Sequence, residues 1–125
     1  MKLFLFTSMI NEASVRIQAL LEKSFPGVDI EVYRTIDGLS ARLHQPKDDA
    51  FVAVLLAENG KELLDFHTLL NLFRDIRIIL VVPDRNQETI TLAHQLRPNF
   101  LCYKNSDFTE VIAVLNKMLQ AYRHS

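Results

Sequence analysis

The stretch AFVAVLLA, residues 50–57, is the most apolar run in the chain, and none of its side chains carries a polar atom. A half-exposed strand alternates apolar and polar residues, so this run predicts a strand that is covered on both faces. Strands of this kind belong to parallel sheets with helices on both sides. Residues 50–57 therefore predict a buried strand in an α/β protein.

On either side of this run, segments with strand patterns alternate with segments of helical spacing. Four more segments have strand patterns: residues 3–6, 29–35, 76–82 and 100–103. Five segments with helical spacing separate or follow them: residues 11–23, a short stretch after Asp37, 61–75, 87–96 and a final helix after Asp107. Such alternation predicts right-handed crossovers and a parallel sheet. We expect the flavodoxin-like fold, with strand order 2-1-3-4-5 and five helices on both faces.

A few residues predict where these helices begin and which way they face. Asn11 and Asp37 are placed to cap the helices that follow them, because their side-chain oxygens accept from free backbone N–H groups. Asp107 and Glu110 form a pair that resembles a capping box. In the third helical segment, His67 falls on the apolar stripe, so we expect it in the core or at its margin.

Length and composition limit what this chain can be. Its 125 residues are 49% hydrophobic and 23% charged, which suits one globular domain spanning residues 1–125. The net charge of −1 argues against a dedicated nucleic-acid binder. The single cysteine excludes an internal disulfide, and the N-terminal apolar run of four residues is too short for a signal peptide or a membrane span. We expect a cytoplasmic protein without membrane contact.

The order and spacing of the elements resemble the receiver domain of the two-component response-regulator family, over essentially the whole chain. Two stretches are more closely similar: VYRTIDGL, residues 32–39, resembles the second strand and its Asp-Gly turn, and FLCYK, residues 100–104, resembles the last strand and the family's Lys. The resemblance implies a role in two-component signalling or a phosphorelay. In that family an Asp after the third strand accepts a phosphoryl group beside Mg²⁺.

Compared residue by residue, most of the family's phosphorylation machinery is missing. Uncharged Thr7 and Ser8 replace the acidic pair that helps hold Mg²⁺, and the phosphoacceptor position falls near Leu55, in the apolar run. Only Lys104 matches the family, and it is a surviving switch lysine, an exposed loop lysine or a partner for Glu58. Glu58 in turn is either a polar loop residue or a built-in phosphate mimic. We therefore expect a pseudo-receiver, neither enzyme nor cofactor or metal binder. Its degenerate pocket comprises Thr7, Ser8, Leu55, Glu58, Pro83, Asp84 and Lys104.

The resemblance also implies a protein-binding surface. Receivers commonly use the fourth helix, fifth strand and fifth helix to bind partners or to dimerise. The function expected here is thus a non-catalytic module that acts by protein–protein interaction, including homodimer formation. The candidate contact residues are Leu92, His94, Gln95, Tyr103, Asn116 and Tyr122. Leu92 and Tyr122 suit the margin of the core equally well.

Two alternatives remain open from the sequence. The first is a phosphorylatable response regulator with a non-standard acidic site, in which Glu58 or Asp84 lies beside Lys104 and a divalent cation. The second is a small-ligand or FMN-binding flavodoxin-like protein that uses the hydroxyl-rich loop after the first strand. That loop has no glycine, although close approach of a backbone to phosphate favours one. Cys102 is predicted to be a buried, inert core residue, and the four histidines do not have the spacing of metal ligands.

Overall fold

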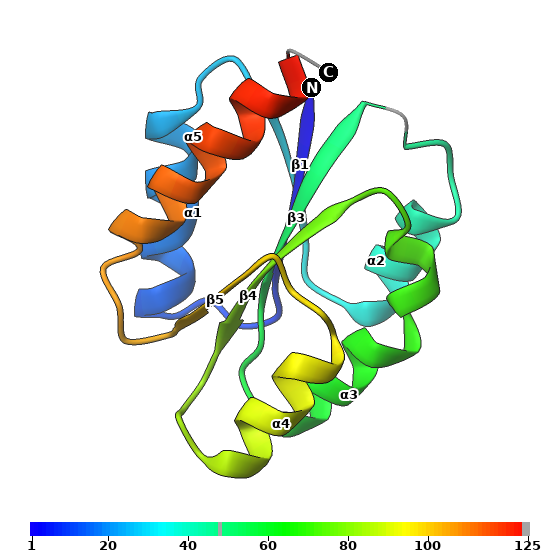
Figure 1. Cartoon of the computed structure of the whole chain (residues 1–125), viewed down its shortest axis with the longest axis vertical. Helices are drawn as coiled ribbons and strands as arrows, with labels where there is room; N and C mark the ends of the chain where they lie inside the picture. The colour runs from blue at the N-terminus through cyan, green and yellow to red at the C-terminus, as the bar shows by residue number, and fades with distance from the viewer. Residues whose placement is uncertain (48, 124–125) are drawn as a thin grey trace.

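A computed structural model describes residues 1–47 and 49–123 of the chain (Figure 1). Five strands form one parallel sheet, and their order β2-β1-β3-β4-β5 confirms the predicted flavodoxin-like arrangement. The strands are β1 (Lys2–Thr7), β2 (Asp29–Tyr33), β3 (Ala50–Leu56), β4 (Arg77–Val82) and β5 (Phe100–Tyr103). Residues 50–56 of the AFVAVLLA stretch form β3, the middle strand, which pairs with β1 on one side and β4 on the other.

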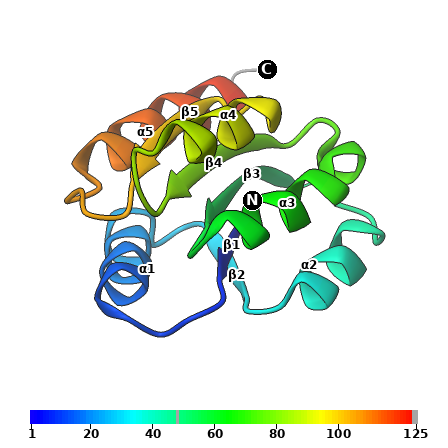
Figure 2. The ribbon, with the colours of Figure 1, turned by 90° about the horizontal axis from the view of Figure 1, so that it is seen from below.

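Helices cover both faces of this sheet (Figure 2). One face carries α1 (Glu12–Ser24) and α5 (Thr109–Arg123), and the other carries α2 (Ile36–Leu43), α3 (Gly60–Thr68) and α4 (Gln87–Gln95). Successive side chains of a strand point to opposite faces, so β3 supplies both layers of the core. Val54 lies in the layer under α1 and α5, whereas Leu55 lies in the layer under α2, α3 and α4, and both are fully buried.

The starts of two helices differ from the prediction. The proposal that Asp37 caps α2 is wrong: the Thr35 hydroxyl accepts from the Gly38 N–H at 3.0 Å, and Asp37 lies in the first turn. A negative charge there still favours the helix, because the N-terminal end of the helix dipole is positive. At α1, by contrast, the predicted cap is confirmed, since the Asn11 side chain accepts from the Ser14 N–H at 3.0 Å.

The predicted capping box before α5 is also wrong. The Asp107 carboxylate accepts from the Thr109 N–H, only two residues further on, at 3.0 Å, which is an Asx turn. The chain then passes through Phe108, which has a left-handed backbone conformation with a φ of 63°. Phe108 is nevertheless buried, so its packing against the core compensates for the backbone strain.

The segment 61–75, predicted as one helix, is broken. Helix α3 ends at Thr68 and a 3₁₀ turn, Leu70–Phe73, follows it. Phe66 lies in the core against Phe6, with ring centroids 5.0 Å apart, and His67 is exposed. The expected position of His67 in the core or at its margin is therefore wrong, because the buried stripe passes through the neighbouring residue.

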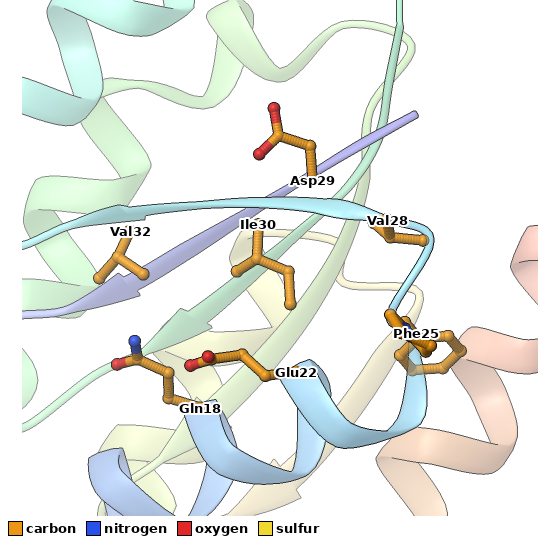
Figure 3. Close-up of a pocket in the computed structure, with 8 residues that line it drawn as sticks. Gln18, Glu22, Phe25, Val28, Asp29, Ile30 and Val32 are labelled. Atoms are coloured by element: carbon orange, nitrogen blue, oxygen red, sulfur yellow. The ribbon is translucent and has the colours of Figure 1, made fainter.

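The terminal strand β2 has two unlike faces. On the side of α2, Lys2 Nζ, Tyr33 OH and Arg42 Nε donate to the Glu31 carboxylate at 2.8, 2.6 and 2.9 Å. Burial alone would raise the pKa of Glu31, but these three hydrogen bonds outweigh burial and lower the pKa to about 2. On the opposite face of β2, the side chains of Ile30 and Val32 point toward α1 (Figure 3).

Within residues 1–47 and 49–123, no helix has the length and apolar character needed to cross a bilayer.

Candidate functional site

The loops that follow the strands gather at one edge of the sheet, because parallel strands all end on the same side. Most of the predicted pocket residues lie there. Ser8 comes after β1, Glu58 after β3, Pro83 and Asp84 after β4, and Lys104 after β5. In open α/β sheets, ligands bind at this edge, in the crevice outside the carboxyl ends of the strands.

A salt bridge between Glu58 and Lys104 dominates this edge. Since β4 lies between β3 and β5, the two side chains meet across the end of β4. The Glu58 side chain is only 4% exposed, whereas that of Lys104 is 30% exposed. Asn11 Nδ2 donates to the other Glu58 carboxylate oxygen at 3.0 Å. Both oxygens of Glu58 therefore have partners, and the carboxylate joins the ends of β3 and β5 to the start of α1.

Arg16 on α1 holds the loop after β5 in place. Its guanidinium donates to the carbonyl oxygens of Lys104 and Ser106 at 3.2 and 2.8 Å, and it lies 5.0 Å from the Phe108 ring centroid. Sequence reasoning missed Arg16, because the carbonyls that it contacts lie 88 and 90 residues away in the chain. Beside it, a shallow depression of about 420 Å³ is lined by Asn11, Glu12, Ala13, Arg16, Pro83, Lys104 and Asn105.

The other predicted pocket residues do not converge on this depression. Thr7 is fully buried, and its hydroxyl accepts from Arg34 Nη1 at 2.8 Å. Leu55 lies inside the apolar layer under α2, α3 and α4. The Asp84 carboxylate is exposed and accepts from the Asn86 N–H at 2.9 Å. Arg34, like Arg16, was not singled out from the sequence, since a lone arginine after a strand has no distinguishing pattern.

Across residues 1–47 and 49–123, no three His, Cys, Asp or Glu side chains lie close enough together to hold a metal ion. His44 and His94 are exposed, whereas His124 lies outside the described residues. The thiol of Cys102 is buried, and burial first, with the Glu110 charge second, raises its pKa to about 12.

The predicted contact residues line one side of the molecule, with one exception. Helices α4 and α5 cover opposite faces of the sheet, and β5 is its last strand (Figure 1). His94, Gln95 and Asn116 are exposed there, and Leu92 is half-buried. The Tyr103 ring is covered by the Arg85 guanidinium, 3.6 Å from the ring centroid.

Tyr122 lies apart from Tyr103. Its ring packs against Phe51, at the start of β3, with centroids 5.7 Å apart. Tyr103, by contrast, is the last residue of β5. The two tyrosines therefore lie at opposite ends of the sheet.

A scan of protein-family models and a search of curated proteins find no match to this sequence. Solved structures do match its fold. The signal receiver domain of a DNA-binding response regulator from Colwellia psychrerythraea superposes with a TM-score of 0.76 at 15% identity, over 95% of this chain and 98% of that one. A CheY-like response regulator protein from Mesorhizobium loti has a TM-score of 0.65 at 20% identity, over 94% and 97%.

A third match is the phosphorylated cyanobacterial phytochrome response regulator RcpA. It has a TM-score of 0.68 at 16% identity and covers 94% of this chain and 89% of that one. All three superpose on at least 94% of this chain, with TM-scores of 0.65 to 0.76. The chain therefore has the fold of a response-regulator receiver domain.

Proposed function

We propose that this chain is a non-catalytic, receiver-like signalling module that acts by protein–protein interaction and has lost the phosphorylation site. The observation that carries the proposal is the salt bridge between Glu58 and Lys104. The Glu58 carboxylate pairs with the Lys104 ammonium, which is the cation that a phosphoryl group would otherwise contact. The positive charge of Lys104 at this edge of the sheet is thus neutralised by a carboxylate of the same chain.

The charges at this edge support the proposal. A phosphoryl group needs cations and hydrogen-bond donors, and Mg²⁺ needs several carboxylate oxygens. Here the Lys104 ammonium is paired, and the Thr7 hydroxyl accepts from Arg34. Both oxygens of Glu58 have donors from Lys104 and Asn11. Binding Mg²⁺ at Glu58 would mean separating a carboxylate from its ammonium in a site with little access to water, which is unfavourable.

A ¹⁵N–¹H NMR titration with Mg²⁺ and beryllofluoride tests the loss of phosphorylation, because beryllofluoride mimics a phosphoryl group on a carboxylate. We expect the amide signals of Thr7, Glu58 and Lys104 to stay in place. Joint shifts of these amides and of Tyr103 would instead support a phosphorylatable regulator with a non-standard acidic site. In that case Glu58→Gln and Asp84→Asn, titrated separately, would identify the acceptor.

The proposed partner surface is the side formed by α4, β5 and α5. Its members are Leu92, His94, Gln95, Tyr103 and Asn116, and a second copy of the chain is one partner that it would accept. Tyr122 packs against Phe51 at the far end of the sheet and is left out of this surface. The exposed polar residues on α4 and α5 suit a reversible contact, since permanent interfaces are more apolar.

Analytical ultracentrifugation over a range of concentrations tests self-association through this surface. Asn116→Arg adds a bulky charge to the exposed side of α5, and we expect it to abolish any dimer. Asn71→Arg is the matched control, because Asn71 is exposed in the 3₁₀ turn after α3. A dimer that survives Asn116→Arg would place the interface elsewhere.

A further inference from the structure

Three side chains with complementary chemistry meet at the edge of the sheet where the strands end. One carboxylate oxygen of Glu58 accepts from Lys104 Nζ, and the other accepts from Asn11 Nδ2 at 3.0 Å. An amine, a carboxamide and a carboxylate that contacts both are the groups needed to exchange one amide for another. We propose that Lys104 and Asn11 become joined by an isopeptide bond, and that Glu58 is the acid–base catalyst of its formation.

The reaction needs no reactant besides these three side chains. Glu58 takes a proton from the Lys104 ammonium, and the freed electron pair of Nζ attacks Asn11 Cγ to form the new C–N bond. The bond between Cγ and Nδ2 then breaks, and Glu58 passes a proton to Nδ2, which leaves as ammonia and becomes ammonium in water. Atoms and charge balance, because one ammonium group and one carboxamide give one amide and one ammonium ion.

The start of α1 holds and polarises Asn11 for this attack. Asn11 Oδ1 accepts from the Ser14 N–H at 3.0 Å, and the Asn11 N–H donates to the Ser14 hydroxyl at 2.9 Å, so the capping box fixes the carboxamide. Negative charge develops on Oδ1 when Cγ is attacked. A backbone N–H at the positive end of a helix dipole stabilises that charge. The helix cap therefore also supplies an oxyanion site.

Burial and access suit the base and the nucleophile. The Glu58 side chain is only 4% exposed, so few water molecules compete for the proton that it carries. Lys104 is 30% exposed on a flexible stem, so its Nζ can swing from the carboxylate to Asn11 Cγ. Asn11 and Lys104 line the same depression of about 420 Å³, which gives room for this movement and a path out for ammonia. The salt bridge described above is thus the state that precedes the reaction.

This inference goes beyond the proposed signalling role and leaves that role intact. The reaction happens once per molecule and turns over no substrate. A crosslinked Lys104 is an uncharged amide, so it offers a phosphoryl group no cation. The new bond also closes a covalent loop from residue 11 to residue 104, which lowers the entropy of the unfolded chain.

The test is mass spectrometry of the full chain during incubation of the folded protein at neutral pH. We expect the intact mass to fall by about 17 Da, the mass of ammonia, and a protease digest to contain the Asn11 peptide linked to the Lys104 peptide. Cyclisation of Asn59 with the following Gly60 would give the same intact mass, so the linked peptide is the decisive observation. Protein kept unfolded in urea should form no linked peptide, because the three side chains are then apart.

Variants assign the role of each side chain. Lys104→Arg keeps a cation beside Glu58 but has no amine to attack, and Asn11→Ser keeps a good helix cap but has no carboxamide, so neither should form the linked peptide. Glu58→Gln removes the base and should slow the reaction at least about 100-fold. Lys117→Arg, an equal change on the exposed side of α5, is the matched control and should react as the unaltered protein does.

Three results would overturn the proposal: a folded protein that forms no linked peptide on prolonged incubation, an ammonia loss located at Asn59 alone, or a linked peptide that forms equally fast in Glu58→Gln. The comparison of folded and urea-unfolded protein decides the matter even where a variant fails to fold. These outcomes are independent of the beryllofluoride titration, because the mass measurement requires neither Mg²⁺ nor a phosphoryl analogue.

Discussion

Replacing Lys104 by Met should destabilise the protein more than replacing Glu58 by Gln, although each change breaks the same salt bridge. The asymmetry follows from burial, because the Glu58 side chain is 4% exposed and that of Lys104 is 30% exposed. Lys104→Met leaves a buried carboxylate without its cation. Glu58→Gln leaves an ammonium that water can still reach.

The magnitudes follow from the same exposures. Removing one partner of a buried pair costs about 3–5 kcal/mol, and the partial exposure of Lys104 favours the lower end, about 3 kcal/mol for Lys104→Met. For Glu58→Gln, which keeps an oxygen for Asn11, we expect about 1.5 kcal/mol. In a chain of 125 residues, 1 kcal/mol shifts Tm by about 4 °C, so the expected losses are about 12 and 6 °C.

Urea titration and thermal melting of the two single variants and of the double variant provide the measurement. The double variant should recover about 1–2 kcal/mol relative to the sum of the single losses, since it leaves no unpaired charge. Lys117→Met, an exposed lysine on α5, is the control and should change the free energy of unfolding by less than about 0.5 kcal/mol. Equal losses for the two single variants, or additivity in the double variant, would refute the reasoning.

Three further predictions concern other parts of the fold. Because the pKa of Glu31 is lowered in the folded state, this carboxylate stabilises the fold above its ordinary pKa of 4.5, and the stabilisation is lost as the pH falls toward about 2. In Glu31→Gln, the urea midpoint should therefore depend less on pH over that range. An unchanged pH dependence would contradict the role of the cluster. Cys102, buried with a pKa of about 12, should react with a chromogenic thiol reagent only after unfolding in guanidinium chloride, and rapid native labelling would count against its burial. Arg97 follows α4 with a left-handed φ of 51°, so Arg97→Gly should stabilise by about 0.5–1 kcal/mol in thermal melting, whereas a loss would mean that its side chain contributes more than the strain.

The fold was predictable because its signals are local and repeated. An apolar run such as residues 50–57 and the alternation around it point to one architecture, and short-range patterns suffice for that. The places where prediction failed are those where two local patterns compete. Thr35 and Asp37 are both good capping residues two positions apart, and only the packing of α2 selects Thr35. His67 and Phe66 likewise compete for one buried stripe, which the larger apolar side chain occupies.

The site was predictable only in part. Glu58 and Lys104 follow strands that end at the same edge of the sheet, so the sequence allowed a contact between them as one of several roles for Lys104. Arg16 and Arg34 were missed because each acts through carbonyl or hydroxyl groups on distant segments, Lys104 and Thr7 among them. Such contacts depend on how helices and loops pack and leave no periodic trace in the chain. Arginines that hold backbone in place are therefore found only in three dimensions.

The Glu58 carboxylate that pairs with Lys104 is part of the chain from the moment it folds. Under the proposed function, Glu58 makes this domain a component with a single setting, which no kinase or phosphatase acts on. Its influence in a cell would then scale with the number of copies and with competition among partners for its surfaces. Synthesis and degradation, on the timescale of growth, would replace the seconds-long chemistry of phosphoryl transfer as the means of control.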